Sequence, residues 1–284
     1  MIYKTIISVD NLKNNLNNDD FLIFDSRCDI KDSGYGIDSY TEGHIPNSIF
    51  VDVDTDLASE KRPGTGRHPL PDPNTFSEKL SHWGMSNNKQ VVVYDDAGGA
   101  FAGRLWWMLK WLGHEAVAVL DGGLNSWVKG GNKLVTTPTV FEKAHFEPCV
   151  QENMIATVED VEEAQFKMNT ILLDARSKER YQGINDPVDP IAGHVPGAIS
   201  HPLGTNLDKT AKFRRKEDLQ HNFNKISNDM KDKEIISMCG SGITACHNIL
   251  ALEIIGIRDV KLYVGSWSEW ITDANRTIVT IKSN

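Results

Sequence analysis

A strand, a tight turn and a helix follow one another in the stretch Glu234-Ile235-Ile236-Ser237-Met238-Cys239-Gly240-Ser241-Gly242-Ile243-Thr244-Ala245. The first five residues have the pattern of a strand, and the apolar run from Ala245 to Ile255, ended by Gly256, has the pattern of a helix. Cys239 is therefore expected on a Gly-rich turn at the N-terminus of that helix. There, unpaired backbone N–H groups and the positive end of the helix dipole are expected to favour a negatively charged sulfur. The turn is predicted to hold a nucleophilic sulfur anion, or an anion attached to that sulfur.

The sequence of the first half recurs in the second half. Four matched pairs of segments occur in the same order: 21–27 with 171–176, 42–48 with 192–198, 91–95 with 235–239, and 121–127 with 264–270. A chain of 284 residues is long for one domain and natural for two. We therefore predict two domains, residues 1–133 and 158–284, joined by a linker at 134–157 that shows no clear periodicity.

Each half alternates short apolar strand patterns with helical patterns. The strand patterns lie at 91–94, 116–120, 171–173 and 260–264, and the helical patterns at 103–112 and 244–255. This alternation predicts an α/β fold in which a parallel sheet is flanked by helices in each half. Ligands of such sheets bind beyond the carboxyl ends of the strands, which is where Cys239 is expected.

Composition narrows the classes of function. The chain is 40% hydrophobic and 24% charged, as soluble globular proteins are, and its net charge of −9 argues against a nucleic-acid partner. The four cysteines, Cys28, Cys149, Cys239 and Cys246, form no C-x-x-C pair, so neither a zinc knuckle nor a disulfide framework is expected. The N-terminus has no apolar signal region, and no stretch approaches the about 18 apolar residues of a membrane span. We expect a cytoplasmic protein with reduced thiols, no membrane partner, no metal and no organic cofactor.

Together these motifs resemble the rhodanese family in its tandem form, and within it the 3-mercaptopyruvate sulfurtransferases. The resemblance rests on the paired Asp-x-Arg segments, the paired Gly-His-[Ile/Val]-Pro segments, the Cys239 loop and the ending Gly265-Ser266-Trp267-Ser268-Glu269-Trp270. It implies two rhodanese-like domains, the second catalytic and the first an inactive copy, in agreement with Asp95 at the place of the cysteine. The implied reaction transfers sulfane sulfur from a small-molecule donor to Cys239, which becomes a persulfide, and then to an acceptor. The acceptor is cyanide or a thiol such as thioredoxin or another small thiol.

The residues after Cys239 suit a persulfide. A persulfide is anionic and needs several hydrogen-bond donors without bulky side chains around it, which the small residues at 240–242 permit. The alternative is that Cys239 is a small buried hydrophobic residue at the end of a core strand. The residues expected to bind the substrate, together with Arg180, are Gly240, Gly242, Ile243 and Thr244.

The charge of the loop predicts the donor. Thiosulfate-type members of the family carry basic residues after the cysteine, commonly Cys-Arg-Lys-Gly, which suit a dianionic donor. This chain has an uncharged loop instead, as the mercaptopyruvate type does. The resemblance also implies a Ser241–His68–Asp54 arrangement, in which Asp54 orients His68 and His68 transfers protons near the donor through Ser241. Asp52 is the alternative to Asp54, and a loop histidine bonded to a backbone carbonyl is the alternative for His68.

Binding of the donor carboxylate is where the sequence departs from the family. Arg180 matches the first of two arginines that hold this carboxylate in mercaptopyruvate enzymes; its alternative is a surface arginine paired with a neighbouring acid. The second arginine has no clear counterpart, because the segment Asn185-Asp186-Pro187-Val188-Asp189-Pro190 is shorter and acidic there. Arg104 is a candidate replacement. The missing arginine leaves thiosulfate:cyanide sulfurtransferase as the alternative function.

Two further classes of function are weighed against this one. A phosphatase with a cysteine loop needs the pattern Cys-x5-Arg, and position 245 is Ala245. A non-enzymatic sulfur-relay module would release sulfur once, whereas an enzyme turns over.

His44 and His194 recur in both halves although only one half has the cysteine, which predicts a structural role for both.

Overall fold

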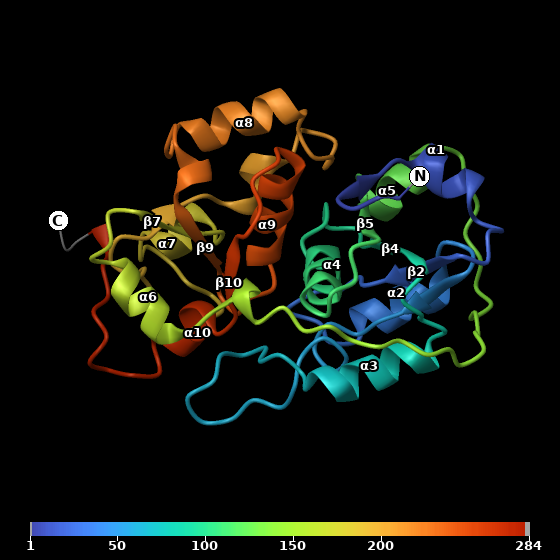
Figure 1. Cartoon of the computed structure of the whole chain (residues 1–284), viewed down its shortest axis with the longest axis horizontal. Helices are drawn as coiled ribbons and strands as arrows, with labels where there is room; N and C mark the ends of the chain where they lie inside the picture. Colours follow the sequence, from blue (N-terminus) through green and yellow to red (C-terminus); the bar gives the residue numbers. More distant parts are fainter. Residues whose placement is uncertain (1, 282–284) are drawn as a thin grey trace. The chain divides into compact units, whose positions relative to one another are not determined.

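The computed structural model describes residues 2–281 (Figure 1). The chain divides into two compact units. Unit 1 consists of Met1–Ser59, Leu70–Gln151 and Lys209–Phe213, and unit 2 of Glu60–Pro69, Glu152–Asp208 and Arg214–Asn284. The domain boundaries expected from the sequence stay predictions. For the site, the segment that matters is Glu60–Pro69, which packs with unit 2.

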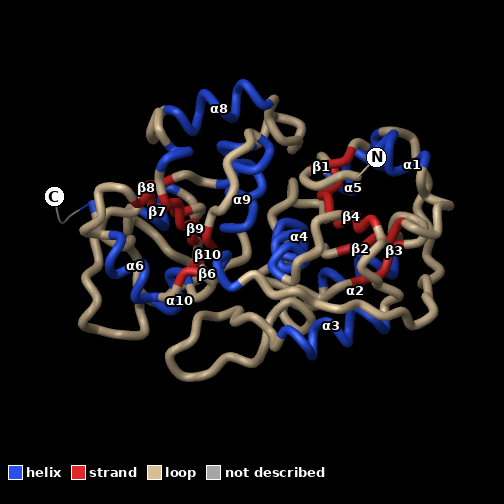
Figure 2. Tube along the Cα trace, in the orientation of Figure 1, coloured by secondary structure: helices blue, strands red, loops and turns tan. Residues whose placement is uncertain are grey.

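Unit 1 is built on a parallel sheet with strand order β1-β5-β4-β2-β3. In Figure 2 its strands lie together in red among blue helices. The strands are β1 (Ile6–Ile7), β2 (Phe21–Asp25), β3 (Ser48–Phe50), β4 (Gln90–Tyr94) and β5 (Val117–Leu120). The helices are α1 (Val9–Asn14), α2 (Tyr35–Glu42), α3 (Pro73–His82), α4 (Ala102–Trp111) and α5 (Gly123–Lys129).

Unit 2 has a second parallel sheet, with strand order β6-β10-β9-β7-β8. Its strands are β6 (Ile155–Ala156), β7 (Thr170–Asp174), β8 (Ile199–Ser200), β9 (Glu234–Met238) and β10 (Lys261–Tyr263). Its α-helices are α6 (Val158–Ala164), α7 (Lys178–Tyr181), α8 (Lys216–Asn224), α9 (Ala245–Ile254) and α10 (Ser266–Trp270). Short 3₁₀ turns are η1 (Glu152–Met154), η2 (Leu203–Asn206) and η3 (Met230–Asp232).

The two sheets repeat one topology. In each sheet the first strand along the chain, β1 or β6, lies at one edge. The strand that precedes Asp95 or Cys239, β4 or β9, lies in the centre. The predicted α/β class, with a helix-flanked parallel sheet in each half, is therefore confirmed. The expected strand Glu234–Met238 is observed as β9, and the expected helix beginning near Ala245 is observed as α9.

The repeated Asp-x-Arg and Gly-His-x-Pro segments tie strand to turn in unit 2. Asp174, at the end of β7, forms a buried ion pair with Arg176 (Oδ2–Nη2, 2.6 Å), and the same nitrogen donates to the Gly193 carbonyl at 2.7 Å. The neighbouring His194 bonds through Nδ1 to the Tyr181 carbonyl at 2.7 Å and stacks on the Tyr181 ring.

Unit 1 contains the same arrangement. Arg27 joins Asp25 to the Gly43 carbonyl, and His44 bonds to the carbonyl of Tyr40 and stacks on its ring. Both histidines thus bond to and stack on a tyrosine of their own unit, in agreement with the structural role that duplication predicts for them.

The core of each unit lies against its central strands. In unit 2, α9 is buried along most of its length, so the helix that follows Cys239 is fixed against β9 and β10. In unit 1, the tryptophans of α4 (Trp106, Trp107 and Trp111) are all buried. Within residues 2–281, no helix has both the length and the apolar character that a membrane span requires.

Candidate active site

Cys239 lies directly after β9, at the carboxyl edge of the unit 2 sheet, with 1% of its surface exposed. The start of α10 holds the backbone on either side of it. The N–H of Cys239 donates to Ser266 Oγ at 3.1 Å, and its carbonyl accepts from the N–H of Trp267 at 3.0 Å. The next carbonyl, that of Gly240, accepts from the N–H of Ser268 at 2.9 Å. The ending Gly265–Trp270 therefore acts as the clamp that shapes the cysteine loop.

Glycine is favoured at two positions of this loop, for different structural reasons. Gly242 has φ +78°, and a Cβ there would lie 2.4 Å from the Val264 carbonyl oxygen, so the backbone admits no side chain. Gly240 has no such backbone strain. A Cβ at Gly240 would instead lie 2.9 Å from Nη2 of Arg180 and 2.9 Å from Nη2 of Arg67. Glycine at 240 thus leaves room for two guanidinium groups against the first turn of the loop.

Unit 1 shows what a loop of this type binds. Asp95 follows the central strand β4 just as Cys239 follows β9, and its side chain is fully buried. Its carboxylate accepts hydrogen bonds from the N–H groups of Ala97, Gly99, Phe101 and Ala102, at 2.8 to 2.9 Å. In that copy the turn between strand and helix encloses a negatively charged group with backbone donors alone. Cys239 occupies the corresponding place after the central strand of unit 2.

The loop brings one predicted pair of residues together. His68 Nδ1 lies 2.7 Å from Ser241 Oγ, and both residues belong to unit 2 although they are far apart in the sequence. Asp54 belongs to unit 1, and its part in orienting His68 stays a prediction. Its neighbour Asp52 is used locally: Asp52 Oδ1 accepts the N–H groups of Asp54 and Thr55 at 2.8 and 2.9 Å. The choice between Asp54 and Asp52 for the orienting role stays a prediction.

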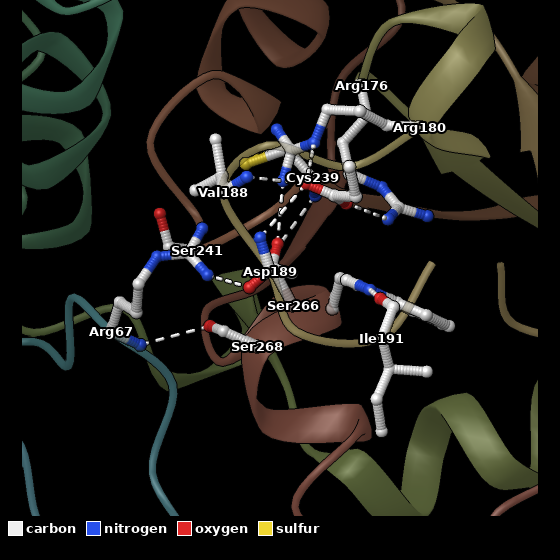
Figure 3. Close-up of polar contacts among 12 residues, drawn as sticks. Arg67, Arg176, Arg180, Val188, Asp189, Ile191, Cys239, Ser241, Ser266 and Ser268 are labelled. Atoms are coloured by element: carbon white, nitrogen blue, oxygen red, sulfur yellow. Dashed lines mark hydrogen bonds and ion pairs between the residues drawn. The ribbon is translucent and has the colours of Figure 1, made fainter. Parts of the chain in front are cut away.

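Arg180 is bound to acids and also lies against the loop. Its Nε donates to Asp186 Oδ1 at 2.9 Å and its Nη2 to Asp189 Oδ2 at 2.6 Å. The second carboxylate oxygen of Asp189 accepts from Nη1 of Arg67 (Figure 3). The pairing of Arg180 with neighbouring acids, considered above as the alternative to donor binding, is therefore observed, and donor binding by Arg180 stays a prediction.

Ion pairs extend the cluster to a run of alternating charges. Arg67, Asp189, Arg180, Asp186, Arg176 and Asp174 follow one another, and the link between Asp186 Oδ2 and Arg176 Nη1 is 3.7 Å long. These three arginines and three aspartates have a formal net charge of zero. The acidic segment that replaces the second family arginine thus supplies the partners of the arginines that remain.

Arg67, for which the sequence predicted no role, also lies against the cysteine loop at Gly240. Its signal was its place directly before His68, which was already expected at Ser241. Arg104, the suggested replacement for the second arginine, lies in α4 of unit 1 with its side chain buried, and its Nη2 donates to the Leu57 carbonyl at 3.2 Å. The guanidinium that lies with that of Arg180 at Gly240 is that of Arg67, and a role for Arg104 in donor binding stays a prediction.

The remaining cysteines differ from Cys239 in setting. Burial, followed by the charges of Asp54, Asp52 and Asp29, raises the pKa of the Cys28 thiol to about 12, so that thiol stays protonated near neutral pH. Cys246 is buried in α9 and its Sγ lies 3.4 Å from the Gly242 carbonyl oxygen, whereas Cys149 is exposed. Across residues 2–281, no group of three or more histidine, cysteine or acidic side chains is placed to hold a metal ion.

The fold and the cysteine loop define a class: duplicated α/β proteins with a cysteine at the carboxyl edge of one sheet. Comparison with known proteins identifies the family. The model of the rhodanese-like domain matches residues 8–130 and 157–273, and the chain belongs to the rhodanese family.

Relatives cover nearly the whole chain. A probable 3-mercaptopyruvate sulfurtransferase of Pseudomonas aeruginosa is 39% identical over 277 residues, which cover 97% of this chain and 98% of that protein. The thiosulfate sulfurtransferase of Rattus norvegicus is 34% identical over 242 residues, covering 83% of this chain and 80% of its own length. Among solved structures, the SseA 3-mercaptopyruvate sulfotransferase of Escherichia coli is similar with a TM-score of 0.81 at 30% identity, over 94% of this chain and all of that one. The resemblance predicted from the motifs is thereby confirmed.

Proposed function

We propose that the protein is a sulfurtransferase that moves sulfane sulfur from 3-mercaptopyruvate to a thiol or cyanide acceptor through a persulfide on Cys239. The observation that carries the proposal is the setting of Cys239. It lies on a loop without charged side chains, at the N-terminus of a buried helix, beside two guanidinium groups. Relatives named 3-mercaptopyruvate sulfurtransferase, among them that of Homo sapiens at 34% identity over 235 residues, covering 81% of this chain and 78% of that protein, support the same donor.

In the first half-reaction, the Cys239 thiolate attacks the sulfur of the donor. The new Sγ–S bond forms as the bond between sulfur and C3 of mercaptopyruvate breaks, and the electron pair passes to the ketone to give the enolate of pyruvate. The donor thiol loses one proton and C3 gains one, so no proton is consumed overall. The Ser241–His68 pair supports this proton transfer, because its hydroxyl and imidazole are already within hydrogen-bonding distance of each other.

In the second half-reaction, a thiolate acceptor attacks the outer sulfur of the persulfide. That sulfur leaves on the acceptor, and Cys239 departs as the thiolate that the helix N-terminus stabilises. Cyanide attacks in the same way and gives thiocyanate. We propose thioredoxin or another small thiol as the acceptor.

Charge favours a monoanionic donor over thiosulfate. Thiosulfate carries two negative charges, and the arginines beside the loop are already compensated by Asp186 and Asp189. One uncompensated charge at 4 Å is worth about 4 kcal/mol at an effective dielectric of 20, so the second charge of thiosulfate is poorly held here. Thiosulfate sulfurtransferase remains the second candidate function, because relatives of that name are 34% identical to this chain.

Persulfide formation on Cys239 tests the proposal. A Cys149→Ser variant removes the exposed thiol that would also be modified. After reaction with 3-mercaptopyruvate, mass spectrometry should find one added sulfur atom on the peptide with Cys239, and cyanide should release it repeatedly as thiocyanate. The additional change Cys239→Ser should abolish both signals. Sustained turnover without Cys239 would contradict the proposal, and a single release of sulfur would identify a relay rather than an enzyme.

A further inference from the structure

We propose that Arg67 is the second guanidinium that binds the carboxylate of the donor, and that Asp189 positions it beside Arg180. This inference rests on the proposed function, since it names the residues that hold the donor in that reaction. The motif comparison expects the second guanidinium in the segment 185–190, which contains none. The structure supplies one from the segment Glu60–Pro69, which packs with unit 2.

Arg67 is anchored at its backbone to the element that shapes the cysteine loop. Its N–H donates to Ser268 Oγ at 3.0 Å, and the N–H of Ser268 donates to the Gly240 carbonyl at 2.9 Å. The preceding Gly66 lies so close to Gly265 that a Cβ would be 2.4 Å from the Gly265 carbonyl oxygen. Arg67 and Gly240, the first residue after Cys239, are therefore both hydrogen-bonded to Ser268.

Asp189 holds the two guanidinium groups at one place. Its side chain is 1% exposed, and each of its two oxygens accepts from a different arginine, Arg67 on one and Arg180 on the other (Figure 3). Hydrogen bonds also hold the segment around Asp189. The N–H groups of Val188 and Asp189 donate to Asp186 Oδ1 at 3.0 Å each, and Trp267 Nε1 donates to the Ile191 carbonyl at 2.8 Å.

Arg67 and Arg180 each keep an N–H-bearing nitrogen near Gly240 that is not used in their ion pairs. Within residues 2–281, Nη2 of Arg67 and Nη1 of Arg180 have no hydrogen-bond partner, although both side chains are largely shielded, at 26% and 17% exposure. These are nitrogens that approach Gly240, at 2.9 Å for Arg67 Nη2 and 3.5 Å for Arg180 Nη1 from the site of its absent Cβ. Two N–H groups from different arginines that point to one face suit a carboxylate, which accepts hydrogen bonds on both oxygens.

The absence of a side chain at Gly240 thus makes room for the guanidinium group of Arg67. Members of the family with a basic residue at the position after the cysteine supply positive charge from the loop itself. Here that position carries no side chain, and the space beside it is taken by guanidinium groups from α7 and from the segment Glu60–Pro69. Arg67 and Arg180 then offer two N–H groups to a carboxylate, but their paired aspartates leave no excess positive charge for a dianion.

Kinetics with two donors test the inference. The first donor is 3-mercaptopyruvate, and the second is mercaptoacetone, which keeps the ketone and the thiol but has a methyl group in place of the carboxylate. Arg67→Met should raise KM for 3-mercaptopyruvate about 10- to 100-fold, the effect expected from losing a hydrogen bond between charged groups. It should leave kcat/KM for mercaptoacetone within about twofold, since that donor has no carboxylate to lose. The matched control is Arg62→Met, an exposed arginine of the same segment, which should change neither donor.

The role of Asp189 is tested by coupling. Asp189→Asn should raise KM for 3-mercaptopyruvate and spare mercaptoacetone. Its effect should be smaller in the Arg67→Met background than in the wild type, because one of the two groups it positions is then absent. Equal losses with both donors would show that the loop is damaged and would overturn the inference, as would an unchanged KM for 3-mercaptopyruvate in Arg67→Met. A wild-type protein that does not turn over 3-mercaptopyruvate would instead refute the proposed function itself.

Discussion

Substitution of Gly242 by alanine tests how tightly the cysteine loop is shaped. Gly242 has φ +78°, a conformation that costs a residue with a Cβ about 1–2 kcal/mol. The added Cβ would also lie 2.4 Å from the Val264 carbonyl oxygen, well inside ordinary contact, and overpacking of this kind costs about 1–3 kcal/mol more. The free energy of unfolding of unit 2 should therefore fall by about 2–5 kcal/mol. Relief of the contact also moves the loop, so turnover per folded molecule should fall.

Gly256→Ala is the matched control, because Gly256 has φ +86° in the same unit and nothing within 4 Å of its Cβ position. It should lose only the backbone contribution, about 1–2 kcal/mol, and keep its turnover. Differential scanning calorimetry at one scan rate and a steady-state assay measure both variants. With a shift of about 2–4 °C per kcal/mol, Gly242→Ala should melt several degrees below Gly256→Ala. Equal melting temperatures and equal turnover in the two variants would refute the view that Val264 constrains the loop.

Three further changes give separate expectations. Gly240→Ala should raise KM for 3-mercaptopyruvate about tenfold by displacing the guanidinium groups beside it, with little change in melting temperature because their ends can shift; an unchanged KM would contradict this placement. Asp95→Asn should cost about 3 kcal/mol or more in a urea titration, because an amide nitrogen would face two of the four backbone N–H donors; wild-type stability would contradict the enclosed carboxylate. Burial lowers the pKa of His201, so its contribution to stability is complete above about pH 6.5 and is lost as the pH falls toward the lowered value. His201→Gln should therefore flatten the fall in melting temperature between about pH 7 and pH 5, and an unaltered slope would count against that role.

The fold was predictable because its signals are local and repeated. The strand before Cys239 and the helix after it are marked by apolar runs and by Gly256, and the structure places both within a residue of expectation. The duplication also separated structure from chemistry. His44 and His194 recur in both halves and serve their own turns, whereas the cysteine occurs in only one half.

The pair of arginines beside the cysteine loop was only partly predictable, because it depends on contacts between residues far apart in the sequence. Arg180 could be placed by its motif, but Arg67 reaches Asp189 from 122 positions away through a segment without periodicity. From the sequence, the acidic segment 185–190 indicates only the loss of an arginine. The carboxylate of Asp189 instead joins Arg67 to Arg180, which no local pattern encodes. Asp54 lies in unit 1, and its pairing with His68 remains a prediction from the resemblance.

In the proposed reaction, Cys239 takes sulfur from a monoanionic donor held beside an uncharged loop. The most direct test is the ratio of kcat/KM for 3-mercaptopyruvate to that for thiosulfate, measured with the same acceptor and with Cys239→Ser as the blank. A preference of about a hundredfold or more for 3-mercaptopyruvate, roughly 2.7 kcal/mol of transition-state stabilisation, is the predicted result. Equal values, or a preference for thiosulfate, would contradict the account and identify the protein as a thiosulfate sulfurtransferase.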